Sequence, residues 1–156
     1  MPESAATRWM RWKFNLFPAF RGTGGRVTYI ASDFSEVRVR LPLSWRTRNL
    51  VGTIYGGSMY GAVDPMYMIM LMRILGRDYI VWDKTAAIRF RKPGRTTLFA
   101  TFQIGVREVE EIRALTAAGE PIDRVYLVDL VDADGVVHAS AEKTIYVKRK
   151  SVTPSS

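Results

Sequence analysis

The residues best suited to chemistry lie in an apolar stretch near the middle of the chain. Asp64 is a single carboxylate within the run from Gly57 to Leu75, and the pair Gly56-Gly57 comes just before it. Where a loop becomes a helix, the first backbone N–H groups lack intrahelical partners and point outward at the positive end of the helix dipole. Such amides can stabilise an oxyanion, and glycine lets a carbonyl approach them closely. A nearby carboxylate can activate water or attack an acyl carbon directly.

The spacing of Asp64 predicts how the helix presents it. Asp64 follows Gly57 by seven residues, about two helical turns, and so returns to nearly the same face. Pro65 lacks the N–H that would bond the carbonyl of Gly61, so we expect the helix to loosen or kink at the acid. Burial should raise the pKa of Asp64, while polar neighbours would keep it ionised. The structural alternative is a buried aspartate held by hydrogen bonds across a helix pair.

Few other side chains in the sequence offer catalytic chemistry. The chain has no cysteine and one histidine, which excludes disulfides and thiolate nucleophiles and gives little support to a metal site, so we predict none. Ser58 lacks the Gly-x-Ser-x-Gly context of a serine hydrolase. His138 has no obvious Ser or Asp partner and is interpreted as structural.

The elements that position these residues follow from hydrophobic periodicity. The run 57–75 is apolar on every side of a helical wheel, which predicts one long buried helix. The first two of the predicted strands form a hairpin, and Asp132-Ala-Asp-Gly135 predicts a tight turn between the last two. Together these elements predict an α+β fold, with one long central helix wrapped by about six mostly antiparallel strands. The predicted strands are 27–32, 36–41, 79–91, 96–107, 124–131 and 136–148.

The chain ends and the acidic connection complete the predicted organisation. At 156 residues the chain fits one domain, 1–156, with a core over about 27–148, an N-terminal helix and loop over 1–26 and a frayed tail over 151–156. Residues 8–20 predict a short amphipathic helix ending near Pro18, interpreted either as a lid on the domain's own core or as a membrane-surface helix. Residues 108–123 are acidic and are predicted to form a solvated connection between strands, with at most a helical turn.

The charge distribution limits the partners. The formal net charge of +8 is concentrated over 8–26, 84–95 and 148–150. A basic surface attracts nucleic acid, anionic lipid or a nucleotide-bearing ligand. No aromatic-rich RNA-binding motif or helix-turn-helix occurs, so we expect no nucleic-acid partner. The acid and the proline within 57–75 argue against a transmembrane segment, and the N-terminus does not read as a secretory signal, so a cytoplasmic location is expected.

The segment Asn49-xx-Gly52-Thr-Ile-Tyr55-Gly56-Gly57, followed by Asp64, resembles a family signature. It looks like that of the hotdog-fold acyl-CoA thioesterases of the phenylacetate-pathway and human acyl-CoA thioesterase 13 type, where Asn-xx-Gly-xx-His-Gly-Gly precedes a carboxylate on the central helix. The resemblance covers about residues 27–148 and is nearest to a little-characterised branch of thioesterase domains with an aromatic in place of the motif histidine. It implies a hotdog fold, Gly57 N–H as oxyanion donor and Asp64 as base or nucleophile.

The resemblance also implies roles for the neighbouring motif residues and a dimeric assembly. Asn49 would brace the loop or touch the reacting group, or it is an ordinary turn residue, while Gly56 shares the helix start with Gly57. Tyr55 replaces the histidine, so any imidazole role is lost or passes to a phenol. Hotdog subunits commonly pair their sheets as homodimers or dimers of dimers and combine the helix of one with groups of the other.

Charged residues of the strand after the helix complete the predicted site. Asp83 lies where some relatives carry a hydroxyl residue, and it would share a proton with Asp64 across the dimer or pair with Lys84. The phosphates of coenzyme A, which enters as part of the substrate and not as a cofactor, would be bound by a basic cluster, or this cluster is a solvated strand face. The cluster consists of Arg89, Arg91, Lys92 and Arg95.

The sequence therefore predicts a homodimeric hotdog domain that hydrolyses acyl-CoA thioesters. One alternative is a noncatalytic hotdog protein that binds acyl-CoA or a fatty-acyl group and has lost the motif histidine. A second is a basic protein that binds nucleic acid or a membrane surface. A hotdog dehydratase is a third, although no His-containing hydratase signature occurs. Two features of the substrate stay open at this point: the acyl group itself, and whether its carrier is coenzyme A or acyl carrier protein.

Overall fold

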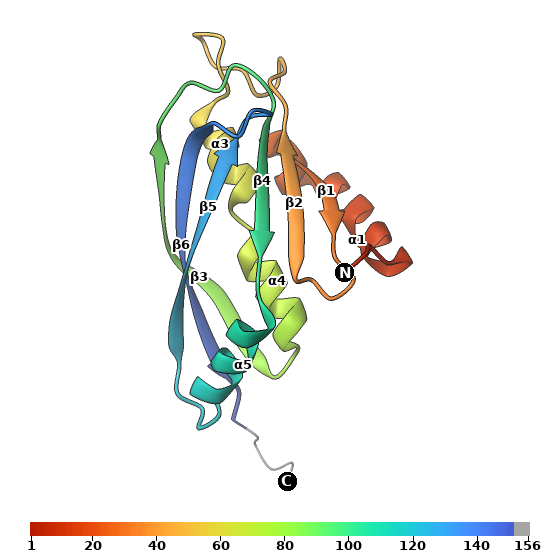
Figure 1. Cartoon of the computed structure of the whole chain (residues 1–156), viewed down its shortest axis with the longest axis vertical. Helices are drawn as coiled ribbons and strands as arrows, with labels where there is room; N and C mark the ends of the chain where they lie inside the picture. The colour runs from red at the N-terminus through yellow and green to blue at the C-terminus, as the bar shows by residue number, and fades with distance from the viewer. Residues whose placement is uncertain (152–156) are drawn as a thin grey trace.

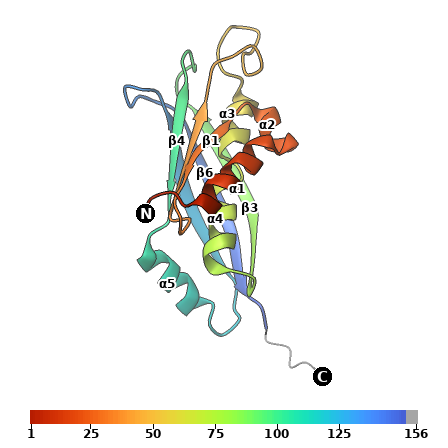
Figure 2. The same ribbon diagram turned by 90° about the vertical axis from the view of Figure 1, so that its right-hand side faces the viewer.

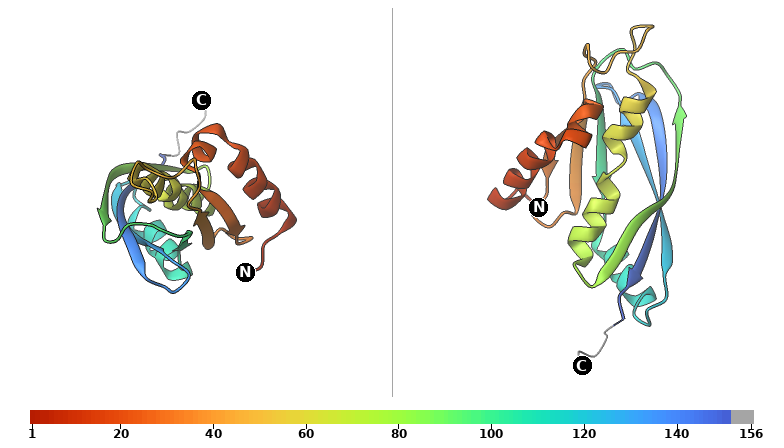
Figure 3. Two further views of the ribbon diagram at one scale, coloured as in Figure 1. Left: turned by 90° about the horizontal axis from the view of Figure 1, so that it is seen from above. Right: turned by 180° about the vertical axis from the view of Figure 1, so that it is seen from behind.

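The apolar run after the glycine pair forms the central helix of the structure, a computed structural model that describes residues 1–151. A six-stranded sheet curves around this helix (Figure 1; Figure 3, left). Most of the predicted tail, 151–156, lies outside the described residues. The helices are α1 (Ala5–Leu16), α2 (Pro18–Thr23), α3 (Gly56–Val63), α4 (Met66–Leu75) and α5 (Val106–Leu115), and the strands are β1 (Arg26–Ile30), β2 (Glu36–Leu41), β3 (Tyr79–Phe90), β4 (Leu98–Gln103), β5 (Ile122–Val131) and β6 (Val137–Arg149).

The sheet has the strand order β1-β2-β4-β5-β6-β3, and every neighbouring pair is antiparallel. Strands β1 and β3 are therefore its two edges. Alternate residues of β2 and β4 are buried against the central helix, as the period of two requires. This arrangement confirms the predicted α+β hotdog architecture, including the first hairpin, β1–β2.

The central helix is interrupted where the sequence predicts a kink. Helix α3 ends at Val63 and α4 begins at Met66, with Asp64 and Pro65 between them. The two segments still follow one another along the same face of the sheet (Figure 2). Within the described range 1–151, no helix has both the length and the apolar character needed to cross a bilayer.

The N-terminal region differs in its boundaries from the predicted helix over 8–20. Ser4 and Thr7 form a reciprocal capping box, so α1 begins at Ala5, and Pro18 opens the separate short helix α2. Helix α1 lies alongside the edge strand β1 (Figure 2). Asn15 holds it there, because its amide donates to the carbonyl of Val27 and its oxygen accepts from the Val27 N–H, both at 2.8 Å.

The acidic connection contains a full helix where at most one turn was expected. Helix α5 covers ten residues, and the strand predicted over 96–107 ends at Gln103. The reason is a short apolar stripe at helical spacing: Ile112 is fully buried and Val109 packs against the core. Charged residues surround this stripe in the sequence and conceal it.

Candidate functional site

The break between α3 and α4 positions Asp64 within a cluster of polar side chains. The Oδ1 atom of Asp64 accepts a hydrogen bond from the Tyr60 hydroxyl at 2.6 Å and a second from Nζ of Lys143 on β6. The same Lys143 Nζ lies 3.1 Å from Oδ1 of Asp83 on β3. That contact is an ion pair without hydrogen-bond geometry, since the buried Asp83 Oδ1 has no hydrogen-bond partner in the described chain. One lysine thus joins two carboxylates in the same subunit.

Burial and charge act on these groups in opposite directions. The Lys143 side chain is only 1% exposed, while those of Asp64 and Asp83 are 40% and 27% exposed. Burial lowers the pKa of Lys143, but its interactions with the carboxylates of Asp64 and Asp83 outweigh this, and the net pKa lies above its ordinary value. Burial raises the pKa of Asp83 despite the opposing lysine, and burial likewise raises the pKa of Tyr60. Lys143 therefore stays cationic and Tyr60 stays a neutral donor.

Three expectations about this cluster need correction. Asp64 is partly exposed rather than buried, and it is held by a strand lysine and a tyrosine of its own helix rather than across a helix pair. Within one chain, Asp83 and Asp64 both contact Lys143, while proton sharing across a dimer stays a prediction. Asp83 also does not pair with Lys84, because Lys84 bonds Asp123 at 2.7 Å.

Sequence reasoning missed Lys143 altogether, although a signal was present. Strand β6 alternates, and the residues on its inward face are small or apolar apart from Lys143. A lysine in the apolar phase of a strand needs a buried acid, because an unpaired buried cation is costly. That phase pointed to an ion pair with the central helix.

The glycine pair occupies the start of α3, as the motif requires. Tyr55 is the N-cap residue, and its carbonyl accepts from the N–H groups of Ser58 and Met59. Among the described residues, no acceptor is found for the N–H groups of Gly56 and Gly57. A Cβ on Gly56 would lie 2.9 Å from the Phe90 ring, so a larger residue there would have to displace that exposed side chain. Two unpaired amides therefore remain at the positive end of the helix.

Asn49 braces the loop that leads into these glycines. Its Oδ1 accepts from the N–H groups of Val51 and Thr53 at 3.1 and 3.0 Å, and its Nδ2 donates to the Thr53 hydroxyl at 2.9 Å. Both ends of the amide are thus occupied within the loop, which favours the bracing role over contact with a reacting group. The Tyr55 side chain is 60% exposed beside this loop.

A cavity of about 380 Å³ lies next to the start of α3. It unites three groups that the sequence placed far apart, namely the bracing Asn49, the motif Gly56 and the basic residues Arg91 and Lys92. The backbone N–H groups of Arg91 and Lys92 both donate to the carbonyl of His138, which fixes this turn against β6. The complete lining is Asn49, Thr53, Ile54, Gly56, Met59, Phe90, Arg91, Lys92, Pro93 and Gly94.

The structure does not bring the rest of the predicted basic cluster into this cavity. Arg89 lies beside Leu127, Ser140 and Glu142 in a shallow depression that Arg91 also borders. Arg95 is exposed and lines neither hollow. Lys84 is tied to Asp123 and is exposed. Arg91 and Lys92 are therefore the cluster members best placed to meet a ligand near the glycines.

His138 also has the partner that sequence reasoning did not find. Its Nε2 lies 2.9 Å from Asp132 Oδ2, and its Nδ1 lies 3.0 Å from the carbonyl oxygen of Pro93. The imidazole thus links the turn before β6 to the turn after β3. This contact supports the structural interpretation, although the expectation that His138 has no Asp partner was wrong.

The glycine end and the Asp64 cluster cannot act on the same atom within one chain. Seven residues of helix separate Gly57 from Asp64, which is roughly 10 Å along the axis. An oxyanion donor and a catalytic carboxylate must both come within about 3 Å of the reacting group. Within one chain the two groups are therefore too far apart to share one reacting group.

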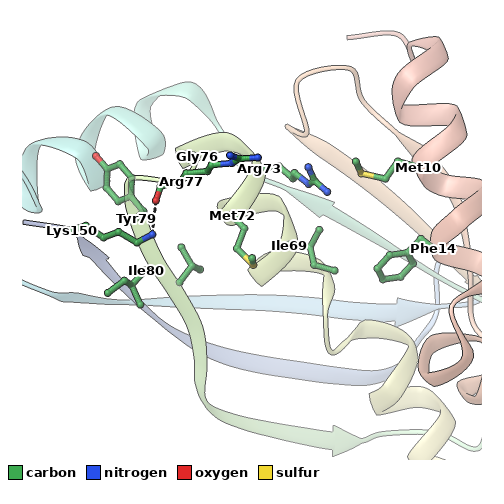
Figure 4. Close-up of a pocket in the computed structure, with 11 residues that line it drawn as sticks. Met10, Phe14, Ile69, Met72, Arg73, Gly76, Arg77, Tyr79, Ile80 and Lys150 are labelled. Carbon is green, nitrogen blue, oxygen red and sulfur yellow. Dashed lines mark hydrogen bonds between the residues drawn. The ribbon is translucent and has the colours of Figure 1, made fainter. Parts of the chain in front are cut away.

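A further cavity, of about 780 Å³, lies away from these residues. It opens between Met10 and Phe14 of α1 and the outer side of α4 (Figure 4). Arg73, Arg77 and Lys150 border it, and none of the predicted site residues does. Over the described part of the chain, no group of three or more His, Asp or Glu side chains could hold a metal ion.

Comparisons with solved structures agree with this architecture. A protein of unknown function from Pseudomonas aeruginosa, described as a probable thioesterase, superposes with a TM-score of 0.81 at 18% identity, covering 96% of this chain and 98% of that one. A thioesterase from Haemophilus influenzae gives 0.64 at 13% identity, with coverages of 88% and 87%. A mutant thioesterase from P. aeruginosa gives 0.67 at 13% identity, with coverages of 90% and 93%. At these identities the likeness establishes the hotdog fold.

Sequence comparison gives the family. No curated protein sequence matches the chain. A family described as "Domain of unknown function (DUF4442)" matches residues 7–147, from within α1 into β6. Because this match includes the glycine motif, Asp64 and Lys143, the chain belongs to that family of domains of unknown function.

Proposed function

We propose that this protein is an acyl-CoA thioesterase in which Asp64 acts as base or nucleophile. The observation that carries the proposal is the way Asp64 is held. Tyr60 and Lys143 both bind its Oδ1, whereas Oδ2 has no partner in the described chain and the side chain is 40% exposed. One oxygen thus fixes the carboxylate and the other is available for reaction.

Two routes use the available oxygen. As a base, Asp64 takes a proton from water while the water oxygen attacks the thioester carbonyl carbon, and the carbon–sulfur bond breaks to release the coenzyme A thiolate. As a nucleophile, Asp64 attacks that carbon itself, expels the thiolate and leaves an acyl-aspartyl anhydride, which water then hydrolyses. Lys143 supports either route, because its hydrogen bond to Oδ1 holds the carboxylate in place and leaves Oδ2 for the reaction.

The amides of Gly56 and Gly57 supply the oxyanion site in this proposal. They lie at the positive end of α3 and lack partners, so a developing alkoxide would take up their hydrogen bonds without reorganisation. Asn49 keeps the preceding loop in place. Arg91 and Lys92 line the adjoining cavity and would meet the phosphates of coenzyme A.

The proposed active unit is a homodimer. The roughly 10 Å of helix between Gly57 and Asp64 requires groups from two subunits at each site. Strand β3 is an edge of the sheet, so its outer backbone groups are available for pairing with a second copy. The Pseudomonas and Haemophilus proteins described as thioesterases have the same fold and support this class of reaction.

The test is thiol release from short, medium, long and aromatic acyl-CoAs by wild type, Asp64→Asn and Asp64→Ala. Asp123→Asn is the matched control, because Asp123 is equally exposed, at 41%, and is also paired with a lysine. We expect kcat/KM of both Asp64 variants to fall by about 100-fold or more, as is typical when a general acid–base group is removed. The control variant should keep its activity. The substrate with the highest kcat/KM identifies the acyl class.

The same experiment separates the alternatives. If acyl-CoA binds without turnover, the protein is the noncatalytic binder considered from the sequence. If Asp64→Asn and wild type hydrolyse equally well, the assignment of Asp64 is wrong. If Asp64 is required, a single turnover in H₂¹⁸O tests the nucleophilic route. Label in Asp64 itself requires an anhydride whose aspartyl carbonyl is attacked by water, whereas label in the released acid alone fits both routes.

A further inference from the structure

The N-terminal helix turns both of its tryptophans away from the protein. Its inward face carries Thr7, Arg11 and Asn15, together with the partly buried Met10 and Phe14. Its outward face carries Trp9 and Trp12, each 61% exposed, followed by Leu16 at 45% and Phe17 at 60%. Trp9, Trp12 and Leu16 follow one another at helical spacing and so form a single stripe.

The polar residues on the inner face make this orientation definite. Asn15 forms two hydrogen bonds with Val27, and Arg11 binds Glu3 at 2.8 and 3.1 Å. The capping box of Ser4 and Thr7 fixes the start of the helix. A helix held by these contacts cannot rotate to bury its tryptophans. They are therefore available to a partner outside the chain.

The surroundings of the stripe are strongly basic. Residues 1–26 contain five cations, Arg8, Arg11, Lys13, Arg21 and Arg26, against the single acid Glu3. Lys13 Nζ lies 4.1 Å from the centroid of the Trp9 ring, so a cation and an aromatic share the outer face. Arg73, Arg77 and Lys150 border the cavity that α1 helps to line, which extends the positive region beside the helix (Figure 4).

We propose that α1 docks this protein on a bilayer surface that contains anionic lipid. Tryptophan prefers the boundary between headgroups and acyl chains, and lysine and arginine beside it bind anionic headgroups. Charge complementarity favours this occupant over a second copy, because two copies meeting through this face would bring like cations, the exposed Arg8 and Lys13 of each, together across an apolar contact. The proposal does not depend on the hydrolysis proposed above.

The test uses the full chain and vesicles of phosphatidylcholine, with or without phosphatidylglycerol, in a co-sedimentation assay. We expect binding to the phosphatidylglycerol vesicles that weakens as salt is raised. Trp9→Ala with Trp12→Ala should lower the partition coefficient by about tenfold or more, because two large side chains no longer enter the interface. Lys13→Glu with Arg21→Glu should lower binding to anionic vesicles and leave the weak binding to neutral ones unchanged.

Trp82→Ala is the matched control. Trp82 is 54% exposed on β3, the sheet edge opposite the one that carries α1, and its loss should leave vesicle binding as in wild type. Circular dichroism and thermal unfolding establish that each variant folds, which is expected because exposed tryptophans are replaced by a strong helix former. Brominated lipid should quench Trp9 and Trp12 when Trp45 and Trp82 are replaced by phenylalanine.

Three results would overturn the proposal. The first is no sedimentation of wild type with phosphatidylglycerol vesicles. The second is equal sedimentation of wild type and the double tryptophan variant. The third is a change from dimer to monomer in that variant, measured by analytical ultracentrifugation, which would identify a second copy as the occupant of this face.

Discussion

The stability of the Asp64 cluster offers the sharpest test of the site geometry. Asp64→Asn keeps the size of the side chain and an oxygen that can accept from Tyr60 and Lys143, so it removes only the charge. The Lys143 side chain is 1% exposed and would then face a single carboxylate, Asp83 at 3.1 Å. Breaking a buried ion pair costs about 3–5 kcal/mol. The remaining carboxylate and the 40% exposure of Asp64 reduce this to about 2 kcal/mol.

Two further variants set the scale. Asp64→Ala also removes both hydrogen bonds, so we expect a loss of about 3 kcal/mol in the free energy of unfolding. Asp123→Asn breaks an ion pair whose side chains are 52% and 41% exposed, so its cost should lie between about 0 and 1 kcal/mol. The expected order of destabilisation is Asp64→Ala, then Asp64→Asn, then Asp123→Asn.

The measurement is urea unfolding at one protein concentration, because an oligomer's apparent stability depends on concentration. A loss of about 2 kcal/mol lowers the urea midpoint by roughly 1 M and the melting temperature by roughly 4–8 °C in a chain of this length. A double-mutant cycle of Asp64→Asn with Lys143→Met gives the coupling directly. If Asp64→Asn costs no more than Asp123→Asn, the buried lysine does not depend on Asp64 and the reasoning fails.

Three other outcomes follow from the structure. Arg91→Gln with Lys92→Gln should raise KM for acyl-CoA by about tenfold at low salt and by less at high salt. The control Arg107→Gln, at an exposed arginine outside the cavity, should leave KM unchanged. If the double variant has the KM of wild type at both salt concentrations, the assignment of these residues to the phosphates is wrong. In the folded protein the pKa of Asp83 lies above its ordinary 3.8, so the stability that protonated Asp83 contributes is present below pH 3.8 and is lost as pH rises through the raised pKa. The free energy of unfolding of wild type, measured in urea relative to that of Asp83→Asn, should therefore fall with rising pH. A rise would refute this. In the folded protein the pKa of Lys143 lies above 10.5, so the stability contributed by the charged lysine is present below pH 10.5 and is lost as pH rises through the raised pKa. Between pH 10 and 12 the free energy of unfolding of wild type should fall more steeply than that of Lys143→Met. Equal slopes for the two proteins would exclude a raised pKa of Lys143.

Much of the fold could be predicted because its signals are local. The alternation in 36–41 predicts a half-exposed strand, and Pro65 predicts the interruption of the central helix; both are present. Helix α5 was missed because a single buried residue, Ile112, and a partly buried Val109 hold it to the core. So short a stripe within a charged segment is weak as a periodic pattern but sufficient for packing.

The site was predictable only in part, because its polar groups meet through long-range contacts. The glycine pair lies at the start of a helix, as local sequence indicates. The contact of Asp64 with Lys143 joins positions 79 residues apart. The alternation of β6 indicates that Lys143 points inward, but no local pattern specifies which acid it meets. The same holds for Asp83, for which the sequence suggested either a proton shared with Asp64 across a dimer or a pair with Lys84, whereas strand register directs its carboxylate to Lys143 on β6.

The Asn15 side chain also protects the sheet from unwanted pairing. Strand β1 is an edge, and Val27 directs its N–H and its carbonyl outward to the two ends of the Asn15 amide. One side chain thereby occupies the hydrogen-bonding groups that another β-strand would otherwise use. A chain cut before β1 would lose this cover together with α1. The sheet would then be expected to grow at that edge into aggregates, whereas the intact N-terminus leaves β3 as the edge available for the proposed dimer.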